Sequence, residues 1–223
     1  MPQLAGPLPH PRCSVVFAYN PGHFNKGWGL NVGARHANSA VLVFTDADLL
    51  VPLMLPRAVE HCLKHVQLVK PYRQVLDLSP EATAHLRAGN SHALQDMASI
   101  ANNRQALGEV APLCGGAFAI RTDAFLKLGG WDERFVGWGA EDDAFSYKVQ
   151  RARLSALEFD DVAALHLHHP RSDDREKNAA QYASNLALLE RYRRYDQPNL
   201  ERLQEVQAQI MGRAQKYRPG SDS

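Results

Sequence analysis

The sequence predicts an α/β layer fold with a largely parallel sheet, and two patterns along the chain lead to that prediction. Short β-prone apolar runs alternate with longer segments of helical spacing, which is typical of a sheet covered by helices. One run, residues 40–44, is apolar throughout, as expected for a strand that is buried on both faces. The chain has 223 residues, of which 45% are hydrophobic, and this suits one compact domain or a domain with a tail.

Charge and cysteine content argue against several classes of protein. The formal net charge is +1, so bulk electrostatics indicate no nucleic-acid partner. The three cysteines are widely spaced, so we expect no disulfide framework and a cytoplasmic location. No run approaches the ~18 apolar residues of a membrane span. Residues 1–13 are rich in proline and lack the apolar core of a signal peptide, so we expect an irregular N-terminal arm.

In the first half of the chain, turn and capping residues separate the expected elements. A β-prone run at 14–19 stops at the turn residues Asn20, Pro21 and Gly22. Ser79 can cap a helix whose first position is Pro80, and the alanine-rich segment after it favours helix to residue 107. In order, the expected elements are strand 14–19, helix 29–40, strand 40–44, helix 52–66, mostly strand 66–78 and helix 79–107.

In the second half, a threonine and a glycine bound a short helix. Thr122 is expected to cap it and Gly129 to end it. The expected elements are strand 117–120, helix 122–129, helix 140–154, mainly strand 156–168 and polar helices at 174–195 and 198–217. The last two helices carry arginines and tyrosines and could touch a membrane surface or a partner protein, although packing on the domain is the simpler reading.

Two aspartates directly follow the buried strand. Asp46 and Asp48 are two positions apart, so in extended chain their carboxylates face the same way. Ligands of open α/β sheets bind at the carboxyl ends of strands, and carboxylates suit Mg²⁺ or Mn²⁺. An isolated Asp-x-Asp is more often a polar loop, but the strand before it makes a metal site an equal alternative.

Residues 129–143 combine two tryptophans, four glycines and five carboxylates, a mixture with little structural use. Gly137, Trp138 and Gly139 suggest a mobile loop whose aromatic ring can close over a sugar. Glu141, Asp142 and Asp143 then begin a helix, whose dipole favours their ionised forms. An ionised aspartate there can accept a proton from a hydroxyl, although acidic residues at a helix start are also common without a function.

Three histidines follow the strand that ends near residue 166. Strand alternation places His166 and His168 on one face and His169 on the other. A neutral imidazole could complete the coordination begun by Asp48, and this is as plausible as a purely structural role.

Four blocks in order resemble the GT-A glycosyltransferases, especially the galactosyltransferase-type C-terminal region of β-1,4-galactosyltransferases, polypeptide GalNAc-transferases and chondroitin-polymerase-like enzymes. The blocks are Phe24-Asn25-Lys26-Gly27 with Leu30-Asn31-Val32-Gly33, then Phe44-Thr45-Asp46-Ala47-Asp48, then Cys114-Gly115-Gly116-Ala117-Phe118, and last Gly137-Trp138-Gly139-Ala140-Glu141-Asp142-Asp143. The resemblance covers about residues 15–170.

The resemblance implies a metal-dependent transfer of a sugar, with inversion, from a UDP-sugar (Gal, GalNAc or GlcNAc) to a hydroxyl acceptor such as a glycan. It implies Asp142 as general base, with Glu141 holding a hydroxyl and Asp46, Asp48 and His166 holding Mn²⁺ or Mg²⁺, where His168 and His169 are alternatives to His166. The other residues that it assigns to donor or acceptor binding are Phe24, Lys26, Asn31, Gly33, Gly115, Gly116, Trp138, Gly139 and Asp143. Lys26 and Arg171 are candidate partners of the diphosphate.

The same resemblance implies a Rossmann-like, three-layer α/β/α domain over residues 14–172, followed by a C-terminal helical extension at 173–223. Members of the family begin with a β-α-β unit that binds the nucleotide base, and the residues before the first expected strand are too few for such a unit of ~30 residues. The alternatives are a misplaced start, a fragment of a longer chain, or base recognition that is rudimentary or supplied by another chain. A non-catalytic or partner-dependent module that cannot bind donor alone is therefore the alternative function. A metal-dependent phosphohydrolase using Asp46 and Asp48 is a third, which leaves Trp138 without a role.

Overall fold

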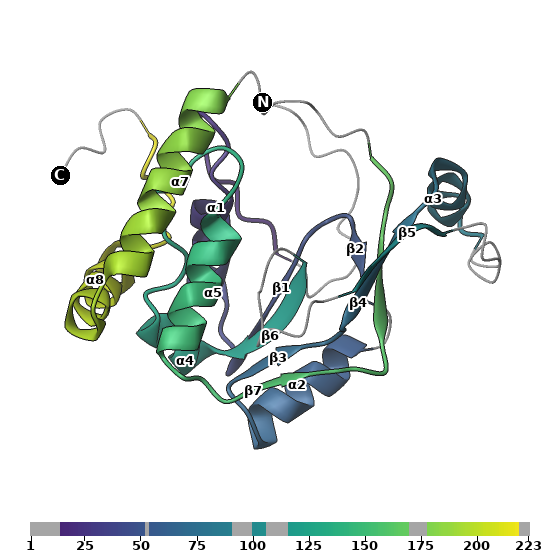
Figure 1. The fold of residues 1–223 in the computed structure, drawn as a ribbon, viewed down its shortest axis with the longest axis horizontal. Coiled ribbons are helices and arrows are strands. Elements are labelled where there is room, and N and C mark those ends of the chain that lie inside the picture. Colours follow the sequence, from purple (N-terminus) through teal and green to yellow (C-terminus); the bar gives the residue numbers. More distant parts are fainter. Residues whose placement is uncertain (1–13, 52–53, 91–99, 106–115, 170–177, 219–223) are drawn as a thin grey trace.

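The computed structural model describes residues 14–51, 54–90, 100–105, 116–169 and 178–218 (Figure 1). Its helices are α1 (Lys26–His36), α2 (Met54–Lys64), α3 (Pro80–Arg87), α4 (Thr122–Lys127), α5 (Glu141–Arg151), α7 (Ala179–Arg194) and α8 (Gln197–Ile210). Its strands are β1 (Val41–Thr45), β2 (Leu49–Leu50), β3 (Leu68–Lys70), β4 (Gln74–Leu78), β5 (Ile100–Gln105), β6 (Ala117–Arg121), β7 (Ala156–Glu158) and β8 (Ala163–His166). The expected α/β class is confirmed.

The strands form two mixed sheets, with the orders β1-β6-β3-β7 and β2-β8-β4-β5. Only the β3–β7 and β4–β8 pairs are parallel among the described strands, so the expectation of a largely parallel sheet is wrong. Parallel neighbours require a crossover connection within one sheet. Here the chain instead passes repeatedly from one sheet to the other, as it does between β1 and β2.

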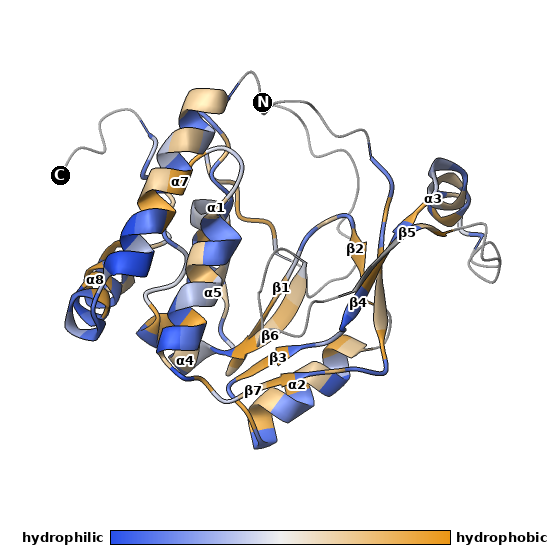
Figure 2. Ribbon diagram, in the orientation of Figure 1, coloured by the Kyte–Doolittle hydropathy of each residue, from blue (hydrophilic) through white to orange (hydrophobic). Residues whose placement is uncertain are grey.

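The first sheet is covered by helices on both faces, which confirms the expected three layers (Figure 1). Alternation along β1 sends Leu42 and Phe44 into a core that includes Phe125 of α4 and Phe145 of α5. Val41, on the other face, packs with residues of α2. Figure 2 shows most of β1 and β6 in the colours of apolar residues, consistent with burial on two faces.

The two C-terminal helices pack beside α5 on the helical side of the molecule (Figure 1). Tyr192 of α7 and Leu200 of α8 are completely buried in a cluster with Ala144 of α5. None of the described helices combines the length and the apolar composition that crossing a membrane requires.

Several expected elements differ from the structure, among them the helix expected over 198–217, which ends at Ile210. Residues 14–19 form no strand and pair with no described strand, and the side chain of Phe17 is 61% exposed. The sequence predicts one helix over 79–107, but α3 ends at Arg87 and residues 100–105 form β5, which pairs with β4. Thr122 is the first residue of α4 and not its cap: the N-cap residue is Arg121, which makes no side-chain capping bond, and the Thr122 hydroxyl donates to the Ser39 carbonyl. Residues 1–13 lie outside the described part.

Candidate active site

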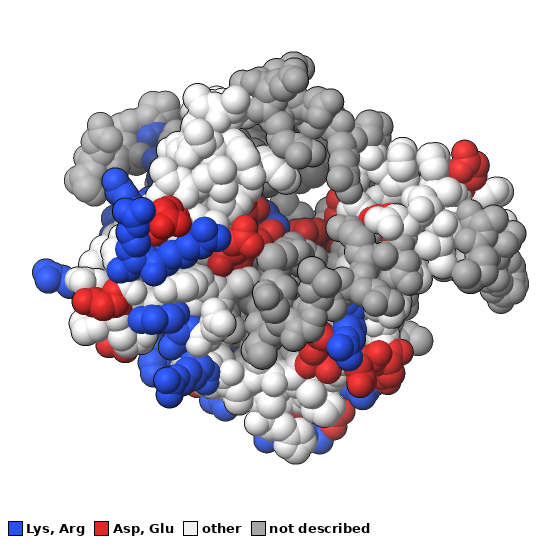
Figure 3. Space-filling view, viewed as in Figure 1, with Lys and Arg blue, Asp and Glu red and all other residues white. Residues whose placement is uncertain are grey.

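Most of the expected catalytic and metal-binding residues line one cleft of about 1070 Å³. The cleft lies between the helical side of the molecule and the second sheet, and Figure 3 shows acidic side chains gathered around this hollow. Those of the expected site residues that line the cleft are Phe24, Lys26, Asp46, Asp48, Trp138, Glu141 and Asp142, together with the alternative histidine His169.

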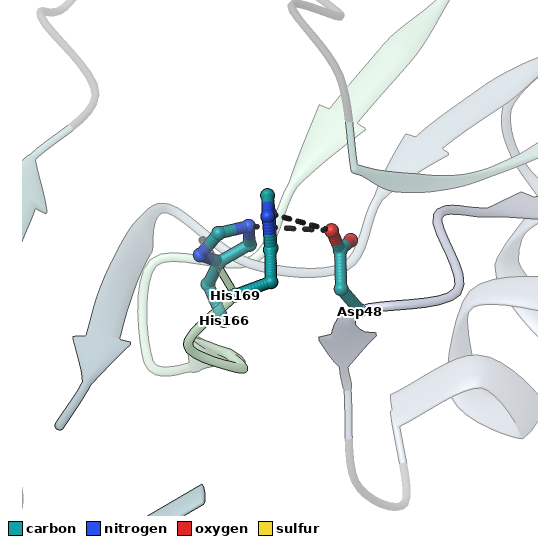
Figure 4. Close-up of side chains that lie close together, drawn as sticks. All are labelled: Asp48, His166 and His169. Atoms are coloured by element: carbon teal, nitrogen blue, oxygen red, sulfur yellow. Dashed lines mark ion pairs between the residues drawn. The ribbon is translucent and has the colours of Figure 1, made fainter. Parts of the chain in front are cut away.

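Asp48, His166 and His169 form a compact group of potential metal ligands (Figure 4). One ligand atom from each lies within 4.8 Å of the others. The Nε2 atoms of His169 and His166 are 3.2 and 3.6 Å from Asp48 Oδ2. Two imidazole nitrogens and one carboxylate oxygen fit a divalent transition ion better than Mg²⁺, which prefers oxygen ligands.

Backbone pairing brings these ligands together from distant parts of the sequence. Leu49 of β2 pairs with His166 of β8, and the Leu167 amide donates to the Asp48 carbonyl at 2.8 Å. Strand β8 ends at His166, so alternation no longer applies and His169, rather than His168, turns toward Asp48. The His168 amide donates to the Thr83 hydroxyl of α3.

Asp46 lies outside this group and faces the helical side of the cleft. Its Oδ2 accepts the Gly116 amide at 2.7 Å, and its Oδ1 lies 3.3 Å from Lys26 Nζ. Gly116 has a φ of +101°, and a Cβ there would overlap the Tyr72 hydroxyl. A glycine is therefore required at this position so that the backbone can hold Asp46.

Lys26 contacts three acidic side chains in the cleft. Its Nζ lies 3.1 Å from both carboxylate oxygens of Asp142 and 3.8 Å from Glu141 Oε1. Burial lowers the pKa of Lys26, but attraction to Asp142, Asp46 and Glu141 outweighs burial and leaves that pKa above its usual value. Lys26 therefore stays charged at neutral pH.

The pKa of the Asp142 carboxyl is raised, whereas the helix dipole alone predicts that it is lowered. Burial raises the pKa of its carboxyl to about 7, Lys26 opposes the rise, and Glu141 and Asp46 add to it. The residue before the helix, Ala140, is left-handed at φ +72° and gives the helix no side-chain cap. An aspartate with this pKa can take up and release a proton near neutral pH, as a general base must.

The Trp138 loop is tied to the C-terminal helices. The side-chain amide of Asn185 on α7 donates to the carbonyls of Val136, Trp138 and Gly139 at 2.9 to 3.3 Å. The Trp138 ring packs on Tyr182, also of α7, with centroids 5.4 Å apart, and remains 59% exposed. A tryptophan presented in this way offers an apolar face to a sugar ring.

The remaining expected site residues do not line the cleft. Asn31 is fully buried and exchanges hydrogen bonds with the Trp131 backbone, so it supports the loop from behind. Gly33 borders a separate groove beside residues 14–18. Gly139 abuts Tyr182, and Asp143 is exposed on α5. Gly115 and Arg171 lie outside the described residues.

Sequence reasoning missed several polar residues around the cleft, including His23 beside Phe24. Arg87 of α3 and Asn178, which precedes α7, line it directly. Asp77 of β4 lies behind His166. No spacing or motif marks the last three positions, because they reach the site through the folding of the second sheet and of the C-terminal helices.

Comparison with known families supports the resemblance over part of the chain. Residues 97–170 match the family model described as the N-terminal domain of galactosyltransferase. This region holds Gly116, Trp138, Asp142 and the histidines, whereas Lys26 and the two aspartates after β1 precede it. The resemblance to galactosyltransferases is confirmed for this region.

The chain also matches solved glycosyltransferase structures, each with a TM-score below 0.5. The catalytic domain of Drosophila β1,4-galactosyltransferase 7, in complex with xylobiose, is 18% identical with a TM-score of 0.41, covering 66% of this chain and 52% of that one. Glucosyl-3-phosphoglycerate synthase from Mycobacterium tuberculosis, with Mn²⁺ and UDP-glucose, is 20% identical with a TM-score of 0.44, covering 80% and 58%. Mannosyltransferase PcManGT from Pyrobaculum calidifontis, with GDP-mannose and Mn²⁺, is 21% identical with a TM-score of 0.47, covering 82% and 52%. The chain thus spans little more than half the length of these structures.

Proposed function

We propose that this chain is a metal-dependent glycosyltransferase that moves a hexose, Gal, GalNAc or GlcNAc, from a UDP-sugar to a hydroxyl of a glycan acceptor. The observation that carries the proposal is one cleft that holds both a transition-metal ligand group and, on its opposite wall, an aspartate whose pKa is raised to about 7. The galactosyltransferase family match over residues 97–170 supports the choice of sugar class.

The metal site occupies the side of the cleft formed by the second sheet. Asp48, His166 and His169 would hold the ion there. A bound divalent cation supplies positive charge beside the diphosphate leaving group. Arg87, which lines the same cleft, is placed to add a second positive charge near the phosphates. Because two of the three ligands are imidazoles, Mn²⁺ is the preferred ion over Mg²⁺.

The helical wall carries the acid–base chemistry. Asp142 would accept the proton of the acceptor hydroxyl as that oxygen attacks the anomeric carbon, on the face opposite the diphosphate, so the configuration inverts. Lys26 fixes the Asp142 carboxylate through two hydrogen bonds of 3.1 Å. Glu141, also beside Lys26, would hold a hydroxyl of one of the two sugars. Trp138 would stack on a sugar ring at the mouth of the cleft.

The test is calorimetric titration of the 223-residue chain with UDP, with and without Mn²⁺. We expect binding that requires Mn²⁺ and weakens at least tenfold in Asp48→Ala and His169→Ala. The variants Asp123→Ala and His85→Ala are matched controls, because both residues are exposed and lie outside the ligand group. Both variants should bind UDP as the wild type does. Release of UDP from UDP-galactose, followed in the presence of candidate acceptors, then measures turnover.

The result that contradicts the proposal is a folded wild-type chain that binds no UDP in the presence of Mn²⁺. That outcome favours the alternative of a module that needs a partner to bind the donor. Mn²⁺-dependent UDP binding without any release of UDP from UDP-galactose would support the donor site and contradict the proposed acceptor half of the cleft.

A further inference from the structure

A row of polar side chains crosses the second sheet behind the metal ligands. In the pairing register, Leu49 of β2 lies opposite His166 of β8, His166 opposite Asp77 of β4, and Asp77 opposite Asn102 of β5. Asp48 immediately precedes Leu49 at one end of this row. The order across the sheet is therefore metal carboxylate, imidazole, carboxylate and amide.

Each neighbouring pair in the row is in contact. His166 Nδ1 lies 3.0 Å from Asp77 Oδ1, while its Nε2 lies 3.6 Å from Asp48 Oδ2. Asp77 Oδ2 accepts the Asn102 side-chain amide at 3.1 Å. The side chains of His166 and Asp77 are 20% and 17% exposed, so the contact between these two residues is largely shielded from water.

We infer that Asp77 is a positioning residue that makes His166 a metal ligand. A carboxylate accepts a hydrogen bond only from a nitrogen that carries a proton, so Asp77 fixes the neutral imidazole in the Nδ1–H form. The lone pair then lies on Nε2, the nitrogen that faces Asp48. Carboxylate partners of this kind also orient the ring and raise the basicity of the ligating nitrogen.

Asn102 completes the arrangement by holding the far oxygen of Asp77. The rotation of the Asp77 carboxylate is thereby limited from β5, and the imidazole plane is set before any ion arrives. His169 lies beyond the end of β8 and has a side chain that is 42% exposed, so its orientation owes less to the sheet. His166 is accordingly the preorganised ligand of the pair.

This inference rests on the proposed metal site, and its first test uses the metal-free protein. Long-range proton–nitrogen NMR of the ¹⁵N-labelled chain at pH 8 reports which imidazole nitrogen is protonated, with His166→Gln identifying the signal. We expect Nδ1–H in the wild type and a shift toward the Nε2–H form in Asp77→Ala. A wild-type His166 that carries its proton on Nε2 overturns the inference.

The second test is Mn²⁺ binding without nucleotide, measured by electron paramagnetic resonance. Asp77→Ala should weaken binding by about 10–100-fold and Asp77→Asn by less, because the amide oxygen can still accept from Nδ1. Asp161→Ala, an exposed carboxylate paired with Arg57, is the matched control. Circular dichroism tests whether each variant is folded. If Asp77→Ala is unfolded, the Mn²⁺ affinity of Asp77→Asn relative to the wild type is the deciding measurement.

The outcomes separate this inference from the proposed function. Mn²⁺ binding in Asp77→Ala within twofold of the wild type overturns the role of Asp77 and leaves the transferase proposal intact. If Asp77→Ala weakens Mn²⁺ binding but the wild-type chain transfers no sugar, the positioning role of Asp77 is supported and the transferase proposal is contradicted. A wild type that binds no Mn²⁺ overturns both.

Discussion

Lys26 and Asp142 meet on the helical wall of the cleft through two contacts of 3.1 Å, although 116 positions separate them in the sequence. Lys26 opens helix α1, and Asp142 lies in the first turn of α5. The pair places a charge that is retained at neutral pH beside a carboxyl whose pKa is near neutrality. The protonation state of Asp142 therefore depends on Lys26, Glu141 and Asp46.

We expect sugar transfer to show an acidic limb near pH 7, because Asp142 can accept a proton only in its ionised form. Below that pH the carboxyl is protonated and kcat/KM falls, and above it the rate reaches a plateau. Asp142→Asn should reduce kcat by at least ~100-fold while Mn²⁺ binding is retained. The measurement is kcat/KM from pH 5 to 9, and a limb that persists unchanged in Asp142→Asn would assign it to another group.

Replacing Lys26 should move that limb to higher pH. The ammonium lowers the pKa of Asp142, so its removal in Lys26→Met leaves burial, Glu141 and Asp46 unopposed. Lys26→Arg keeps the positive charge and should leave the limb near pH 7. The position of the limb, rather than the rate, is the quantity to compare, since both variants also alter donor binding. A limb that moves down in Lys26→Met contradicts this account.

The sequence predicted the parts of the cleft that follow directly from local pattern. The apolar run before Asp46 is a strand, and the helix at Glu141 begins where expected. Both results follow from properties of neighbouring residues, namely periodicity and turn chemistry. The same is true of Gly129, which ends α4 at a φ of +72°.

The parts that sequence reasoning missed depend on partners far away in the chain. Residues 100–105 form a strand because β4 offers them an edge, which the alanine-rich composition of the longer segment 79–107 does not reveal. Asp46 and Asp48 face different partners because the chain leaves β1 of the first sheet just before Asp46 and enters β2 of the second sheet just after Asp48. The contact between Asp77 and His166 likewise requires the register of two strands whose spacing in sequence carries no signal.

Gly116→Ala should destabilise the protein more than Gly89→Ala. Both glycines have positive φ, so each substitution should cost about 1 kcal/mol of backbone strain. Only at Gly116 would the new methyl group meet the Tyr72 hydroxyl, adding roughly 1–3 kcal/mol of overpacking, whereas nothing lies within 4 Å at Gly89. Urea unfolding measures both, and the double variant Gly116→Ala/Tyr72→Phe should recover part of the loss. Equal costs at the two glycines would mean that Tyr72 moves aside.

Asn185→Ala should loosen the Trp138 loop. The side-chain amide serves three loop carbonyls and is 1% exposed, so its removal takes a donor from three partly buried acceptors at a cost of about 1 kcal/mol. We expect faster hydrogen exchange at Gly137 and Gly139 and a higher KM, with little change in Mn²⁺ binding. Asn199→Ala, on the exposed start of α8, is the control. Unchanged exchange in Asn185→Ala would show that the packing of Trp138 on Tyr182 holds the loop by itself.

Lys148 should make the stability of the fold depend on pH above neutrality. This side chain is fully buried, where it donates to the Gly130 carbonyl and to Gln207, and burial lowers its pKa to about 7 against an ordinary value of 10.5. Between these two pH values the unfolded chain binds a proton that the folded chain lacks. The free energy of unfolding therefore rises with pH through this window, and the cost of burying the charge is fully present below pH 7. Urea unfolding from pH 6 to 9 should show this rise in the wild type and in the exposed control Lys127→Met, but not in Lys148→Met. A rise that remains in Lys148→Met would assign it to a different titrating group.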